Sequence, residues 1–91
     1  MKILIPTPLR QYAAKKDTVD APGKTVGEAL SSLTSQYSDL RRHLYTDDGK
    51  LRAFVNVYLN DEDVRVLDGL DTAVGESDTL VILPAMAGGS T

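Results

Sequence analysis

The chain has no cysteine and no tryptophan, and it has one phenylalanine and one histidine in 91 residues. Without cysteine the protein can form neither a disulfide nor a thiolate metal site, and it has no cysteine nucleophile. Because aromatic residues are so few, the core must be built from aliphatic side chains, which predicts marginal stability at this length. The length itself fits one domain.

The sequence also lacks long apolar runs and familiar catalytic motifs. No stretch reaches membrane-spanning length, and the apolar start ends at Pro6, which is too soon for a signal peptide. We therefore expect a cytoplasmic protein with no membrane contact. Neither an HExxH motif nor a phosphate-binding loop is present, and the chain has one histidine and no cysteine. These absences favour a protein that is not an enzyme.

Acidic residues are few in the first half of the chain, and basic residues are few in the second half. Residues 1–46 carry seven Lys/Arg and four Asp/Glu, whereas residues 47–91 carry three Lys/Arg and nine Asp/Glu. With a net charge of -3 and no clustered basic stretch, nucleic acid is not an expected partner. The acidic half either steers a basic partner or is simply a solvated surface.

Five short strands are predicted from β-branched, aromatic and alternating residues. They are expected at 2–6, 18–21, 54–59, 64–66 and 79–83, with a hairpin loop over 11–17 and a polar turn over 60–63. The last strand, Leu80-Val81-Ile82-Leu83, is apolar at every position, which is typical of a strand at the centre of a sheet.

One main helix is expected over about 25–37. Thr25 is a good N-cap, and Glu28 three residues later completes a capping box. Apolar side chains then recur at helical spacing, namely Val26, Leu30, Leu33 and Tyr37. A shorter helix is expected from Asp39 to about Tyr45. The economical packing of these elements is an α+β fold of the β-grasp (ubiquitin-like) type, with a mixed sheet of four to five strands and the helix across one face.

The end of the chain is composed of small residues around a glycine pair. After Pro84 the sequence continues Ala85-Met86-Ala87-Gly88-Gly89-Ser90-Thr91. Glycine has no Cβ and accepts almost any backbone conformation, so this pair can enter a narrow active site. A frayed terminus is the plain alternative. We expect a β-grasp domain over 1–84 and a flexible tail over 85–91.

Three stretches of the chain resemble the ubiquitin-like sulfur carriers of the ThiS/MoaD group. They are Ile5–Arg10, Phe54–Arg65 and Val81–Gly89, and the closest likeness is to the carrier associated with cysteine synthase. The chain departs from the group at Ala85, where a second proline is common, and at Glu76–Asp78, where an Asp-Gly-Asp turn is common. It also continues past the second glycine, where a working carrier ends.

The resemblance implies a chemistry for Gly88 and Gly89. An E1-like enzyme would adenylate Gly89 with ATP, and a sulfur donor would displace AMP and leave a thiocarboxylate. That group would deliver sulfide to a cysteine synthase-like, thiazole synthase-like or secondary-metabolite enzyme. Ser90 and Thr91 would first have to be removed, as by a metallopeptidase. The chain itself would bind no cofactor.

The resemblance and the strand parity also predict a docking surface. If Leu80 and Ile82 point inward, then Val81 and Leu83 are exposed beside the tail. With Leu4 and Pro6 on the first strand, and with Pro84 and Met86 at the tail, they would form an apolar patch for the activating enzyme. Incidental surface apolarity is the alternative.

Other candidates are weaker and other functions stay open. His43 is expected on a solvated helix face. The acidic run Asp61–Asp63 lacks the spacing of a calcium loop and reads as a solvated turn. A ubiquitin-like modifier joined to target lysines through Gly89 would use the same fold and tail, and a plain interaction module would not need the glycines at all.

Overall fold

The structure is a computed structural model that describes residues 1–53 and 55–84, with Pro84 described by its backbone. A five-stranded mixed sheet has the strand order β2-β1-β5-β3-β4. Its strands are β1 (Lys2–Leu4), β2 (Thr18–Asp20), β3 (Val55–Leu59), β4 (Glu62–Asp63) and β5 (Thr79–Pro84). The first and last strands run parallel at the centre, and the other pairs are antiparallel. This is the predicted β-grasp, with five strands.

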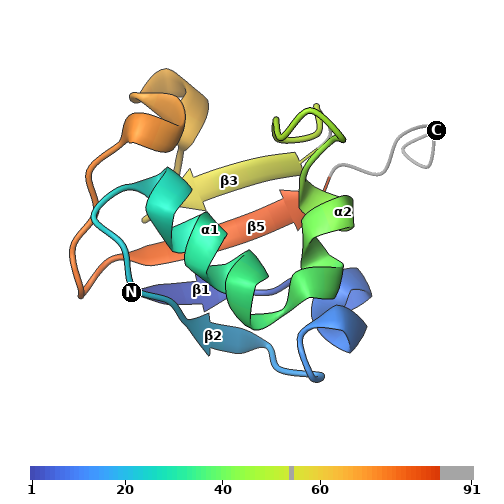
Figure 1. The fold of residues 1–91 in the computed structure, drawn as a ribbon. Helices are drawn as coiled ribbons and strands as arrows, with labels where there is room; N and C mark the ends of the chain where they lie inside the picture. The colour runs from blue at the N-terminus through green and yellow to red at the C-terminus, as the bar shows by residue number, and fades with distance from the viewer. Residues whose placement is uncertain (54, 85–91) are drawn as a thin grey trace, which may run out of the picture.

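Helix α1 (Val26–Gln36) crosses one face of the sheet (Figure 1), as the sequence predicts. Thr25 is its N-cap, since the Thr25 Oγ1 accepts a hydrogen bond from the backbone N–H of Glu28 at 3.1 Å. The Glu28 Oε1 in turn accepts from the Lys24 N–H at 3.0 Å. The first bond satisfies a donor that the first helical turn leaves free, whereas the second reaches the N–H of the residue before the N-cap, one position earlier than in the predicted capping box.

The core lies between α1 and the sheet and is aliphatic, as the composition requires. Its fully buried large side chains are Ile3, Ile5, Val26, Leu30, Leu33, Leu40, Leu44, Leu80 and Ile82. Leu40 belongs to the 3-10 helix η2 (Ser38–Leu40), and Leu44 belongs to the short helix α2 (Arg41–Leu44), so the expected second helix exists in two parts.

Two segments differ from the prediction. The connection from β1 to β2 is not an open loop, because a 3-10 helix, η1 (Thr7–Tyr12), comes before the turn. The prediction of a strand over 64–66 is wrong. Asn60 and Asp61 both have positive φ and make a tight two-residue turn, so pairing starts already at Glu62.

The chain then leaves the sheet at Asp63. The Asp63 carboxylate accepts from the Arg65 N–H at 2.9 Å, which starts the 3-10 helix η3 (Val64–Val66) where a strand was expected. A second 3-10 helix, η4 (Gly69–Asp71), follows before the chain returns to β5.

Candidate functional site: the exposed face and the end of strand β5

Strand β5 occupies the centre of the sheet and is the last element that the structure describes. It pairs with β1 on one side and with β3 on the other, where Pro84 lies opposite Val55. Residues 85–91, which include the candidate residues Met86, Gly88 and Gly89, lie outside the described part of the chain. What the structure describes is therefore the support from which the predicted tail departs.

The side chains of β5 alternate as predicted. Leu80 and Ile82 are buried beneath α1, whereas Val81 is half-buried and Leu83 is 45% exposed on the opposite face. An exposed leucine on a central strand is not needed for the core, because its neighbours along the strand already fill the inner face. It is thus available for contact with another molecule.

The neighbouring strands extend this exposed face. The register places Leu4 of β1 on one side of Val81 and Tyr58 of β3 on the other, and all three side chains are half-buried. We call Leu4, Tyr58, Val81 and Leu83 the outer patch. Pro6 is also half-buried and follows β1 at the end of the sheet where β5 finishes.

Tyr58 was missed by the sequence analysis. The prediction located the strand that contains it, but it did not say which strand pairs with β5. The parity of Phe54–Leu59 could have suggested the face, because Tyr58 has the opposite parity to the buried Val55 and Val57.

A polar clamp borders the outer patch. The Arg65 guanidinium forms an ion pair with the Asp63 carboxylate, at 2.8 Å between Nη2 and Oδ2, and its Nη2 also donates to the Asn56 Oδ1 at 2.7 Å. Asn56 lies opposite Leu83 in the sheet. The hydrogen bonds from Arg65 lower the pKa of the Asp63 carboxyl below its ordinary value.

The start of β5 is held by a second set of polar contacts. The Asp78 carboxylate accepts from the Asn60 Nδ2 at 2.9 Å and from the Gly75 N–H at 2.7 Å, and these bonds lower its pKa. The Asn60 Oδ1 accepts from the Thr79 N–H at 3.1 Å. Asn60 therefore links the turn before β5 to the β3–β4 turn and sets the register of the strand.

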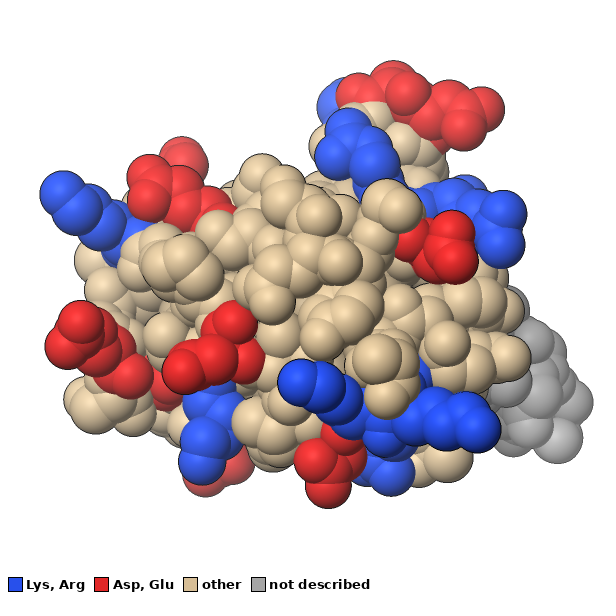
Figure 2. All heavy atoms as spheres, turned by 60° about the horizontal axis from the view of Figure 1, so that its bottom comes forward, with Lys and Arg blue, Asp and Glu red and all other residues tan. Residues whose placement is uncertain are grey.

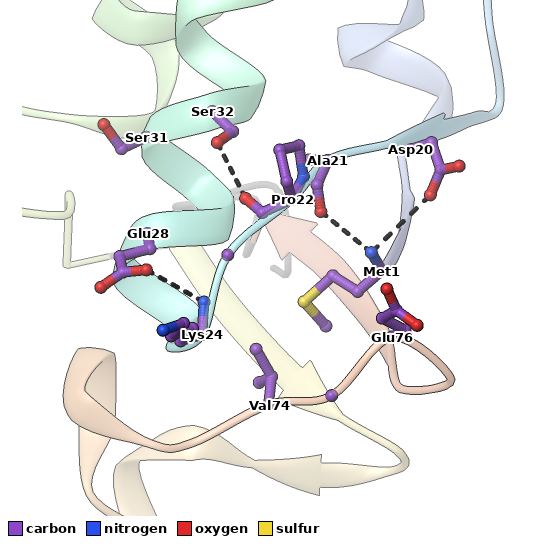
Figure 3. Close-up of a pocket in the computed structure, with 12 residues that line it drawn as sticks. Met1, Asp20, Ala21, Pro22, Lys24, Glu28, Ser31, Ser32, Val74 and Glu76 are labelled. Carbon is purple, nitrogen blue, oxygen red and sulfur yellow. Dashed lines mark hydrogen bonds and ion pairs between the residues drawn. The ribbon is translucent and has the colours of Figure 1, made fainter.

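A large cavity lies away from this site. It is an open groove of about 1030 Å³ beside the β2–α1 connection and the turn before β5, and its lining includes Met1, Asp20, Lys24 and Glu28. Figure 3 shows the Met1 amine directed to the Ala21 carbonyl, at 3.0 Å, and to the Asp20 carboxylate, at 3.7 Å. These contacts are internal to the fold, and the groove adjoins the beginning of β5 rather than its end.

The remaining candidates gain structural roles. His43 was expected on a solvated helix face, but its ring stacks on that of Tyr12, with the ring centroids 4.1 Å apart. It thereby joins α2 to η1. Within the described ranges, no group of three or more His, Asp or Glu side chains is placed to hold a metal ion. No helix in the described part of the chain is both long and apolar enough to cross a membrane.

A β-grasp sheet whose central last strand exposes an apolar face and leads into a glycine-containing end is the architecture of a ubiquitin-like carrier or modifier. The chain belongs to the ThiS family, whose pattern matches residues 3–89. It is a sulfur carrier protein of the CysO/ThiS type and is homologous to non-catalytic proteins.

Three similar proteins from other organisms support this family membership. The sulfur carrier protein CysO of Mycobacterium tuberculosis is 45% identical over 89 residues, with 96% of each chain covered. Small archaeal modifier protein 3 of Haloferax volcanii is 40% identical over 65 residues, covering 71% of this chain and 70% of that protein. The crystal structure of the BexX/CysO complex of Amycolatopsis orientalis contains a chain with a TM-score of 0.87 and 43% identity, covering 97% of this chain and 98% of that one.

Proposed function

We propose that this protein carries sulfur as a thiocarboxylate on the carbonyl carbon of Gly89. The observation that carries the proposal is the family match, which extends to Gly89 and ends there. The relation to proteins named sulfur carriers supports it. The fold supports it as well, because the central strand β5 ends at Pro84, five residues before Gly89.

The chemistry requires an activating enzyme, because a carboxylate is a poor electrophile. The Gly89 carboxylate attacks the α-phosphorus of ATP in an E1-like enzyme, which releases pyrophosphate and forms an acyl adenylate. A sulfide donor then attacks the acyl carbon, and AMP leaves with one of the former carboxylate oxygens. The net change is one oxygen replaced by sulfur. ATP belongs to the enzyme, and the carrier holds no cofactor of its own.

A free Gly89 carboxylate exists only after the peptide bond to Ser90 is cleaved. We propose that a peptidase, of the metallopeptidase class, removes Ser90 and Thr91 before activation. The acceptor that then takes the sulfide belongs to the cysteine synthase-like, thiazole synthase-like or secondary-metabolite class of enzymes. The likeness to CysO supports the first of these.

We further propose that the outer patch, together with Pro6, Pro84 and Met86, docks the activating enzyme. Leu83 and Val81 support this role, since they leave apolar surface uncovered next to the strand end that leads into the tail. A relative in a crystallised complex with BexX supports docking on other proteins. Because one surface adjoins one tail, the activating and accepting enzymes are expected to compete for it.

Intact-mass spectrometry tests the central proposal. The protein ending at Gly89 is incubated with the E1-like enzyme, ATP and sulfide, and the expected product has one oxygen replaced by sulfur. Omitting ATP is the control. If the Gly89 carboxylate remains unchanged, although the same enzyme preparation converts a carrier that it is known to accept, the proposal fails.

A second function is favoured by the modifier relative. Small archaeal modifier protein 3 is 40% identical to this chain, which supports a ubiquitin-like modifier attached to target lysines through Gly89. Isopeptide adducts of the Gly89-ended protein in cell extracts would favour this function, and accumulation of free thiocarboxylate would favour the carrier.

A further inference from the structure

Charge is separated along the direction of β5. The segments 5–17 and 38–53 gather at the end of the sheet where β5 finishes, and we call them the basic pole. Several contacts place them there. Pro84 lies opposite Val55, whose N–H donates to the Arg52 carbonyl at 3.0 Å. The stacking of Tyr12 on His43 joins the two segments.

The basic pole carries seven Lys/Arg and four Asp/Glu, a net charge of +3. The rest of the chain carries three Lys/Arg and nine Asp/Glu, a net charge of -6. Figure 1 shows the elements of the basic pole, η1 and α2, on the right, where β5 ends. In Figure 2, which shares the horizontal axis, acidic side chains predominate on the left, and most basic side chains lie toward the right among fewer acidic ones.

Two of the four arginines of the basic pole, Arg10 and Arg52, are held by backbone carbonyls and not by acidic side chains. The Arg10 Nε donates to the Ile5 carbonyl, and the Arg52 Nε donates to the Arg42 carbonyl, both at 2.9 Å. Among the described residues, no ion pair neutralises these arginines, whereas Arg65, outside the pole, is paired with Asp63. Backbone carbonyls thus orient the guanidinium groups while their charge stays available.

We propose that the enzymes receiving the tail present an acidic surface around the entrance of the channel that Gly89 enters. This inference rests on the proposed function. The tail leaves the fold at the basic pole, so an acidic entrance attracts that pole and repels the acidic remainder of the carrier. The field would turn the carrier tail-first during the encounter, which raises the association rate.

The proposed partner surface has the opposite charge to the one that the net charge of the protein would suggest. A protein of charge -3 would be expected to seek a basic partner, and the acidic half of the sequence suggests the same. The fold reverses this expectation locally, because the acidic residues around the β3–β4 turn and before Thr79 lie at the opposite end of the sheet.

Single charge reversals test the inference. Arg42→Glu and Lys50→Glu change the basic pole at exposed side chains, and Lys24→Glu makes the same change of charge at an exposed site outside it. Association of each Gly89-ended variant with the E1-like enzyme is followed by stopped-flow fluorescence at several salt concentrations. Arg42→Glu and Lys50→Glu are each expected to slow association by roughly three- to tenfold at low salt, and less as salt screens the field.

Lys24→Glu is expected to leave the association rate unchanged or to raise it. Equal slowing by all three reversals, or no slowing by either basic-pole variant, would overturn the inference. Thermal melting of each variant identifies any loss of fold, and thiocarboxylate formation at saturating enzyme is measured alongside. If the wild-type protein forms thiocarboxylate normally but Arg42→Glu and Lys50→Glu associate as fast as wild type, this inference alone is rejected. If the wild-type protein forms no thiocarboxylate, the proposed function is rejected.

A nucleic acid is the competing partner for a basic pole. Binding of a fluorescent 20-base-pair DNA duplex at physiological salt, lost on Arg42→Glu, would overturn the assignment of the pole to an acidic protein surface. We expect no such binding, because four Asp/Glu lie among the seven Lys/Arg of the basic pole and the rest of the chain, with a net charge of -6, repels phosphates.

Discussion

Gly23 shows how a single residue allows the β2–α1 connection to pack closely against α1. A Cβ at this position would lie 2.6 Å from the backbone nitrogen of Ala29, which cannot move without displacing the helix. Gly23→Ala is therefore expected to lower the free energy of unfolding by about 1–3 kcal/mol, as overpacking does. Urea denaturation measures this. Gly75→Ala is the matched control, because its nearest atom is 3.8 Å away, and an equal loss in both would contradict the explanation.

The glycines of the tail are expected to matter for chemistry and not for stability. Gly88→Val and Gly89→Val each add a branched side chain where a close-fitting channel is proposed. In the Gly89-ended protein, either change should abolish thiocarboxylate formation in the intact-mass assay. The thermal midpoint should stay within a few degrees of wild type. Retained sulfur transfer in both variants would contradict a narrow channel.

At the scale of the element, β5 combines two roles on its two faces. Its inner residues complete the core, and its outer residues belong to the outer patch, so an outer change should separate binding from folding. Leu83→Asp is expected to weaken binding to the activating enzyme by about tenfold or more, a loss of roughly 1.4 kcal/mol. Isothermal titration calorimetry measures the affinity. Val66→Asp is the control, because Val66 is 72% exposed and lies outside the outer patch, and equal weakening would reject the patch.

The turn that precedes β5 should make stability depend on pH. The pKa of Asp78 is lowered from its ordinary value of 3.8 because it accepts hydrogen bonds from Asn60 and Gly75. A lowered folded-state pKa contributes stability that is fully present above 3.8 and is lost as pH falls through the folded value. Thermal melts between pH 6 and the acid range, for wild type and Asp78→Asn, are expected to converge at low pH. A constant difference would contradict the assignment.

At the scale of the whole molecule, the length of the chain should switch the carrier on. The 91-residue protein presents Thr91 where the E1-like site is proposed to take glycine, and we expect its β-branched side chain to block the approach. Adenylation is followed as pyrophosphate release. We expect the form ending at Gly89 to be adenylated, and the 91-residue form to be adenylated at least about tenfold more slowly. Equal rates would show that Ser90 and Thr91 need no removal.

Much of this molecule was predictable from local sequence. The Thr25 N-cap, the buried face of α1, the alternation of β5 and the glycine pair are properties of neighbouring residues. The strand predicted over 64–66 failed for a local reason as well. Positive φ at two consecutive non-glycine residues, Asn60 and Asp61, shortens the turn, and composition alone did not distinguish it from a longer one.

The sequence by itself determined the helix, the aliphatic core, the absence of thiol chemistry and the resemblance to sulfur carriers, because each depends on residue types or on short-range spacing. Only the tertiary structure decided that Tyr58 lies beside Val81 together with Leu4, and that His43 stacks on Tyr12. It also decided that the Lys and Arg residues of the basic pole gather where β5 ends. These contacts join residues far apart in the chain. Sheet register and helix docking bring them together through burial of the shared core, which no local pattern encodes.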